Sequence, residues 1–212
     1  MSTTFINYLI PKKTMANILI AYNDNADTSL HGFLQSCADE ARQLCIDHKH
    51  IYTLLSPPDL TESHVIPLME NNQICFIAAH GDSDGVYNEN EEDVVSTRTT
   101  NYIFVKKGFY SIACSCGQNL CSELMRLGLK IFVGYNDSFI VGDNEEVFLN
   151  CAVEGLNALL KGECKNKAHQ AMLAKYDEAI EILPFVDKIR LLYNKERLVF
   201  AGDDNISIKD LK

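Results

Sequence analysis

Two apolar runs of this sequence end in side chains that together can carry out nucleophilic chemistry. The run QICFIAAHG closes on His80 and Gly81, and the run GFYSIACSCG contains Ala113 and Cys114. A thiol becomes a good nucleophile near neutral pH when a base removes its proton, and an imidazole within hydrogen-bonding reach can be that base. The two runs therefore predict acyl transfer, with Cys114 as the nucleophile and His80 as the base.

The elements that must position this pair are two strands. Both runs are continuous and apolar up to their polar ends, which is typical of strands buried on both faces of a parallel sheet. The carboxyl ends of such strands meet at one edge of the sheet, where open α/β folds bind their ligands. We therefore expect His80 and Cys114 to lie side by side at that edge.

Strands alternate with helices along most of the chain, which argues for right-handed crossovers and a mainly parallel sheet. The expected strands cover 17–22, 50–55, 73–79, 109–113, 130–134 and 197–201. Helical periodicity covers 30–45, 61–70 and 119–127, and two longer helices follow with apolar faces at 148–159 and 168–183, the second ended by Pro184.

Residues 84–107 are expected to form an inserted β-hairpin beside His80, because their polarity alternates around an acidic turn. Such an insertion would wall a substrate cleft. The acidic turn, ENEED at 89–93, does not have the ligand order of a calcium-binding EF-hand loop, so a solvated tip is the expectation there.

Composition favours one compact domain over 1–212, with residues 1–16 as an N-terminal extension. The chain has 212 residues, 47% of them hydrophobic, which is enough for a core. Its net charge is −10 and it has no long basic run, which argues against nucleic acid and anionic membranes as partners and favours proteins. Without a signal peptide or a membrane-length apolar run, a cytoplasmic location is expected.

The eight cysteines are expected to be mostly reduced core residues, because most fall at apolar positions of expected helices and strands. Two groups have the residue types of a zinc site, but neither has the paired spacing of a structural zinc motif: Cys114, Cys116 and Cys121, and Cys45, His48 and His50. The sequence thus predicts neither a metal nor a cofactor.

The order of these motifs resembles a known group of enzymes. An apolar strand followed by His-Gly, then an apolar strand followed by Ala-Cys and a glycine, resembles the caspase–hemoglobinase fold of clan CD cysteine peptidases. The block ACSCGQNLCSELMRLGLKIFVGYND and the terminal RLVFAGDDNISI resemble the CHAT branch, a relative of separase and the caspases. The resemblance covers residues 17 to 207 and implies a three-layer α/β sandwich and a cysteine endopeptidase that cleaves a protein partner.

The resemblance also implies a role for individual residues. Cys114 would attack and His80 would protonate the leaving amine, as a dyad without a third member. The N–H groups of Gly81 and Cys114 would form the oxyanion hole. Ile112, two residues before the nucleophile, would line the pocket for the substrate residue preceding the cut, and Asp137 is the nearby source of a carboxylate. With Ile112 in that place, we expect an uncharged residue before the scissile bond.

Regulation by a partner is expected as well. A single domain of this size has no room for a separate sensor, so an activating protein or assembly would order the loops around 82–100 and 135–146. Relatives in the resembled branch often act in programmed death or antiviral defence.

Three alternatives remain open at this point. His-Gly and Ala-Cys are each common as an ordinary turn and an ordinary core pair. Cys116 is a rival nucleophile, since it precedes a helix whose dipole lowers the pKa of a nearby thiol. The whole crevice, finally, would suit a non-catalytic flavodoxin-like or pseudo-protease binding domain.

Overall fold

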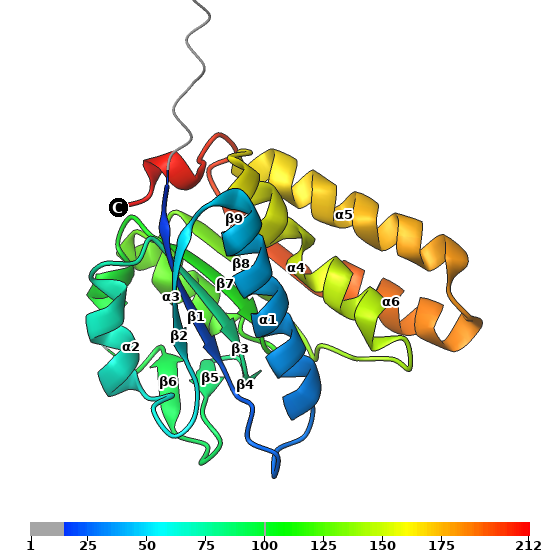
Figure 1. Cartoon of the computed structure of the whole chain (residues 1–212), viewed down its shortest axis with the longest axis horizontal. Helices are drawn as coiled ribbons and strands as arrows, with labels where there is room; N and C mark the ends of the chain where they lie inside the picture. The colour runs from blue at the N-terminus through cyan, green and yellow to red at the C-terminus, as the bar shows by residue number, and fades with distance from the viewer. Residues whose placement is uncertain (1–14, 100) are drawn as a thin grey trace, which may run out of the picture.

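The computed structural model describes residues 15–99 and 101–212, and its centre is a sheet of six strands in these residues (Figure 1). The strands are β1 (Asn17–Tyr22), β2 (Ile51–Leu55), β3 (Ile74–Ala78), β7 (Gly108–Ile112), β8 (Ile131–Tyr135) and β9 (Leu198–Gly202), in the order β2-β1-β3-β7-β8-β9. All neighbours pair in parallel except β9, which is antiparallel to β8. The predicted mainly parallel sheet is confirmed. The predicted extension at 1–16 lies outside the described residues, except for Met15 and Ala16.

Helices cover both faces of the sheet and make a three-layer α/β sandwich (Figure 1). The helices are α1 (His31–His48), α2 (Glu62–Met69), α3 (Asn119–Leu127), α4 (Glu145–Lys161), α5 (Lys165–Ile182) and α6 (Phe185–Arg197). Helices α2 and α3 lie on one side, and α1, α4, α5 and α6 lie on the other. Within the described ranges, no helix is both long and apolar enough to cross a bilayer.

The side chains of each central strand alternate between two cores, because successive residues of a strand point to opposite faces. In β1, Ile18 and Ile20 pack with residues of α1, α4 and α5, whereas Leu19 and Ala21 pack with residues of α2 and α3. All four are fully buried. Burial on both faces explains why these strands are continuous apolar runs in the sequence.

The insertion beside His80 is a small three-stranded sheet rather than a hairpin over the whole of 84–107. It consists of β4 (His80–Gly81), β5 (Gly85–Tyr87) and β6 (Asp93–Ser96), paired antiparallel. The chain then leaves the sheet and forms a short 3-10 helix, η1 (Asn101–Phe104). The predicted hairpin ends early because Phe104 is buried in the core, where its ring meets the edge of Phe109 with centroids 5.6 Å apart.

Helix α6 was not predicted. We expected the helix that ends at Pro184 to be followed directly by a strand at 197–201. The chain instead starts a new helix after Pro184. Its buried positions include the polar Asp187 and Asn194, while Phe185 and Ile189 are exposed. A helix with polar residues on its buried face and apolar residues outside does not give the usual periodic signal.

Candidate active site

His80 and Cys114 lie together at the carboxyl edge of the sheet. Strands β3 and β7 are parallel neighbours with Ala78 opposite Ile112, and each side chain follows two residues after its strand ends. Both residues line one small hollow of about 20 Å³. The rest of its lining is apolar: Leu30, Phe33, Leu34, Ala79, Ile112, Ala113 and Phe139.

Gly81 lets the two strand ends approach each other closely. A Cβ atom at this position would lie 2.8 Å from the carbonyl oxygen of Gly85, 3.0 Å from the Cβ of Ala113 and 3.2 Å from the carbonyl oxygen of Cys114. Any side chain at this position would therefore push the backbone beside His80 away from the backbone of the cysteine. The predicted oxyanion donors, Gly81 and Cys114, belong to these two touching segments, and their role stays a prediction.

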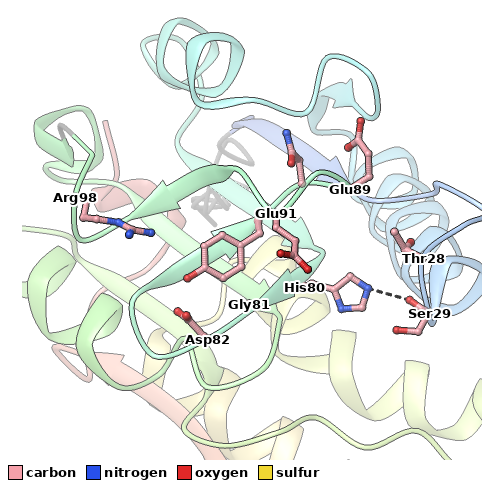
Figure 2. A pocket seen from close by; sticks show the side chains of 10 residues that line it. Thr28, Ser29, His80, Gly81, Asp82, Glu89, Glu91 and Arg98 are labelled. Atoms are coloured by element: carbon pink, nitrogen blue, oxygen red, sulfur yellow. Dashed lines mark hydrogen bonds between the residues drawn. The ribbon is translucent and has the colours of Figure 1, made fainter.

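The imidazole of His80 is oriented by a backbone carbonyl. Its Nε2 lies 3.0 Å from the carbonyl oxygen of Ser29, in the loop between β1 and α1 (Figure 2). A carbonyl oxygen only accepts hydrogen bonds, so Nε2 carries the proton and donates it. In the neutral ring, Nδ1 is then the nitrogen with a free lone pair, which is the state a general base needs. The contact with Ser29 could not be predicted from the sequence, because any residue can supply a backbone carbonyl.

Cys114 is held at the turn from β7 toward α3. It is partly buried, and its Sγ accepts a hydrogen bond from the backbone N–H of Phe139 at 3.4 Å. The next residue, Ser115, has a φ of 57°, in the left-handed region that non-glycine residues rarely adopt. Its N–H donates to the carbonyl of Asp137 at 3.0 Å. Strain of this kind concentrates at functional sites, where neighbouring contacts maintain it.

Cys116, the rival nucleophile, is fully buried. Burial raises the pKa of its thiol, and its Sγ lies 3.5 Å from the carbonyl oxygen of Ala113. The expected effect of the helix dipole is thus outweighed by the loss of solvent around the sulfur. The geometry favours Cys114 over Cys116 as the nucleophile.

The two predicted specificity residues have different surroundings. Ile112 is buried and forms part of the hollow that holds Cys114. Asp137 is half exposed, and its Oδ1 accepts a hydrogen bond from the N–H of Ser138 at 2.7 Å. That bond, together with one from Tyr193, lowers the pKa of Asp137, and Arg197 lies 4.0 Å from its carboxylate. The charge of Asp137 is therefore already partnered.

The loop at 136–144, which we call the cover loop, contributes Phe139 to the lining of the hollow at Cys114. Its Phe139 is buried and packs against Phe33 and Tyr135, with ring centroids 5.8 Å and 4.7 Å away. Asn194 of α6 binds both backbone groups of Ile140 in this loop. The cover loop is thus fixed to the sheet at one end and to α6 at the other.

Asp187 of α6 forms the second attachment of the cover loop. Its carboxylate accepts hydrogen bonds from the N–H of Asp143 and from the side chain of Asn144. The bond from Asn144 contributes most to the lowered pKa of Asp187, which keeps the buried carboxylate charged. A Cβ at Gly142 would lie only 2.2 Å from Oδ1 of Asp187, so this contact requires a glycine.

A larger cavity of about 650 Å³ is also lined by His80 (Figure 2). It is bounded by the loop after β1 and by the small sheet β4–β6. Its charged lining residues are Asp82, Glu89, Glu91 and Arg98. Glu89 and Glu91 were expected on a solvated tip, and the structure makes them part of this wall.

Among the residues that the structure describes, no three His, Cys, Asp or Glu side chains lie close enough together to hold a metal ion. His50, of the second candidate zinc group, accepts a hydrogen bond from the N–H of Ala16 through Nδ1 and donates one to the carbonyl of Leu160 through Nε2. It is a core histidine with both ring nitrogens in use.

Comparison with known proteins identifies the fold. No family model matches the sequence, and no curated protein matches it. The structure matches the complex of the pro- and mature domains of RgpB from Porphyromonas gingivalis with a TM-score of 0.63, 12% identity and 93% of this chain covered. It matches the crystal structure of the Arg specific cysteine proteinase gingipain R (RgpB) with a TM-score of 0.63, 13% identity and 94% covered.

These neighbours are larger proteins, and the match spans 49% of each of their chains. At such low identity the likeness is one of fold. The chain therefore has the caspase-like fold of clan CD cysteine peptidases, as its motif order predicted.

Proposed function

We propose that this chain is a cysteine endopeptidase in which Cys114 and His80 form the catalytic dyad. The observation that carries the proposal is the hollow shared by the two side chains, in which the bond from His80 to Ser29 leaves Nδ1 as the acceptor nitrogen. The caspase-like fold, which is that of cysteine proteinases, supports the same conclusion.

In the proposed reaction, Nδ1 of His80 takes the proton of the Cys114 thiol, and the sulfur attacks the carbonyl carbon of the scissile bond. The N–H groups of Gly81 and Cys114 stabilise the oxygen that becomes negative, and each such donor is typically worth about 3 kcal/mol. The protonated His80 then gives its proton to the leaving amine as the C–N bond breaks. Water, deprotonated by the same imidazole, hydrolyses the thioester and restores the thiol.

We propose further that the chain rests in a closed state and is activated by a protein partner or assembly. The hollow at Cys114 has a volume of only about 20 Å³, so we expect weak activity from the chain alone and stronger activity once the cover loop moves. The expected activator would reorder residues 82–100 and 135–146. High turnover by the purified chain, unchanged by added partners, would contradict this part of the proposal.

A second candidate function is a non-catalytic binding domain of pseudo-protease or flavodoxin-like type. The small hollow favours it, since a site that never opens cannot cleave. The order of the first five strands, β2-β1-β3-β7-β8, is also the flavodoxin-like order. The antiparallel β9 and the paired His80 and Cys114 count against it.

Labelling with a peptide electrophile separates the two candidates. A peptidyl acyloxymethyl ketone that reacts with activated thiols should modify Cys114, as mapped by mass spectrometry, and the Cys114→Ala and His80→Ala chains should remain unlabelled. Cys164→Ala is the matched control, because Cys164 is the other partly exposed cysteine. Labelling of Cys164 alone, or of Cys114 without any need for His80, would argue for the binding domain.

Specificity differs in our proposal from that of the structural neighbour. Gingipain R is described as Arg specific. For this chain we propose an uncharged residue before the scissile bond, because the described residues lining the hollow of Cys114 include Ile112 and no carboxylate. Membership of the CHAT branch, a cytoplasmic location and a role in antiviral defence are proposals supported by the sequence resemblance alone.

A further inference from the structure

His80 separates two spaces of different size. The small apolar hollow contains both His80 and Cys114, whereas the 650 Å³ cavity is lined by His80 and Gly81 and, among the described residues, not by Cys114. The cavity is large enough for one or two amino-acid side chains, since pockets of this size accommodate drug-sized ligands. His80 is thus the residue that lines both spaces.

The proposed reaction indicates which part of a substrate would reach the 650 Å³ cavity. The sulfur of Cys114 binds the acyl half of the substrate, and the imidazole of His80 hands its proton to the leaving amine. The amine half must therefore pass beside His80, on the side away from the sulfur. The cavity is located to receive residues that follow the scissile bond.

The cavity is acidic. Asp82, Glu89 and Glu91 contribute three carboxylates, and Arg98 is the one cation among the described lining residues. That cation is already neutralised, because Arg98 donates two hydrogen bonds to the carboxylate of Asp93, at 3.1 Å from Nε and 2.7 Å from Nη2. A ligand in the cavity meets an excess of negative charge.

Asp82 is held in place by a network that keeps it charged. Its Oδ1 accepts hydrogen bonds from the N–H groups of Asp84 at 2.7 Å and Gly85 at 3.1 Å. Partial burial acts to raise the pKa of Asp82, but the hydrogen bond from Tyr87 and those two backbone bonds together lower it. The carboxylate is thus fixed and ionised at neutral pH.

Glu89 has a carboxylate oxygen that lacks a hydrogen-bond donor in the described part of the chain. Its Oε2 is shielded from solvent and has no hydrogen-bond partner among the described residues. A buried carboxylate oxygen without a partner is unfavourable and calls for an explanation, of which an absent ligand is one. A cationic side chain in the cavity would supply the donor that this oxygen lacks once the Glu89 side chain turns toward it.

We propose that this cavity is the subsite for the substrate residue that follows the scissile bond, and that it selects lysine or arginine there. The proposal rests on the proposed peptidase function, which assigns the amine half to the His80 side. It adds a basic residue after the cut to the uncharged residue expected before it. A basic side chain gains charge-assisted hydrogen bonds with Glu89 and Glu91, which a neutral side chain of the same length does not.

The first test measures cleavage. Quenched fluorescent peptides carry lysine or its uncharged isostere norleucine directly after the cleavage site. A hydrogen bond to a charged group predicts a kcat/KM about 10-fold or more higher for lysine. Glu89→Gln should lower the ratio of the two peptides, while Glu181→Gln, the same charge change on α5, should keep the wild-type ratio. Equal rates for both peptides in an active wild-type chain would overturn the proposal.

The second test does not need turnover. The Cys114→Ala chain is titrated with two labelled tetrapeptides that mimic the amine product, one beginning with lysine and the other with norleucine. The lysine peptide should bind more tightly by about 10-fold or more, and this advantage should shrink as salt is added and in the Cys114→Ala/Glu89→Gln chain. Equal binding of both peptides would overturn the subsite. Failure of the peptidase function shows separately, as an unlabelled Cys114 in the electrophile assay.

Discussion

Asn194 holds both backbone groups of Ile140. Its Oδ1 accepts the hydrogen bond of the Ile140 N–H at 2.9 Å, and its Nδ2 donates to the Ile140 carbonyl at 2.7 Å. Asn194 is fully buried in α6, so these bonds are not shared with solvent. One side chain of α6 thereby fixes the residue next to Phe139, whose N–H lies on the sulfur of Cys114.

Removal of this attachment should expose the nucleophile. Asn194→Ala leaves the partly buried N–H and carbonyl of Ile140 unpaired, which costs up to about 1–3 kcal/mol, and it frees the cover loop to move. We expect a lower melting temperature together with faster alkylation of Cys114 by iodoacetamide, measured by mass spectrometry under native conditions. A destabilised chain in which Cys114 reacts no faster would show that the cover loop does not control access.

The dyad should be essential and Cys116 should not. Cys114→Ala removes the nucleophile and should abolish cleavage, and His80→Ala removes the base, which is typically worth about 10²- to 10⁴-fold in rate. Cys116→Ala should retain most activity. Turnover of peptide substrates checks all three, with circular dichroism as the control for folding. An inactive Cys116→Ala chain beside an active Cys114→Ala chain would reverse the assignment.

Gly81→Ala should impair catalysis more than stability. The added Cβ would meet the backbone of Gly85 and Cys114 and push the strand ends apart, at a cost of about 1–3 kcal/mol. A displacement of about 1 Å between reacting groups lowers the rate by about 100-fold. Gly32→Ala is the matched control, because its Cβ meets nothing within 4 Å and should stabilise the chain by about 0.4–1 kcal/mol. Equal activity of both variants would contradict the close fit.

Stability should fall at alkaline pH because of the buried thiols. Burial raises the pKa of Cys45, Cys75 and Cys151 to about 12 and that of Cys121 to about 11, from an ordinary value of 9.0. The native state then keeps protons that the unfolded chain loses above pH 9.0, so the stabilisation is complete below that pH and is lost as the pH rises toward 12.

Urea titrations at increasing pH measure this loss. The same buried cysteines should resist alkylation near neutral pH while Cys114 and Cys164 react, since only the thiolate is nucleophilic. A free energy of unfolding that stays constant above pH 9.0 would contradict the burial of these side chains.

Substrate profiling should show an uncharged residue before the cut. Ile112 and the apolar lining of the hollow offer no partner for a buried cation, and the carboxylate of Asp137 is already engaged by Ser138 and Arg197. A peptide library read by mass spectrometry tests this preference. Dominance of Arg or Lys at that position, lost in Asp137→Ala, would move the specificity to Asp137.

The sequence predicted the elements with continuous apolar runs well. The strand at 17–22 and the helix at 119–127 have the same bounds in the structure, because β1 is buried on both faces and α3 ends at Gly128, which has a φ of 106°. The neighbouring strands β3 and β7, which precede His80 and Cys114, were predicted from two such runs at 73–79 and 109–113. Continuous burial leaves little room for another interpretation of such residues.

What the sequence did not reveal depends on backbone atoms and on tertiary contacts. The carbonyl of Ser29 orients His80, but a backbone acceptor leaves no residue signature. Helix α6 was missed because Asp187 and Asn194 lie on its buried side. Glu89 looked like part of a solvated tip, since only the folded small sheet brings it to the wall beside His80.

The contact of Gly81 with the cysteine segment is made by the backbone and not by the sulfur. The strand ends and the Ser29 bond to His80 therefore do not depend on the thiol. An inactive Cys114→Ala chain keeps the architecture that holds a peptide while it loses the atom that cuts it. Combined with Asn194→Ala, which frees the cover loop, such a chain becomes a trap that retains its substrate intact and allows it to be identified.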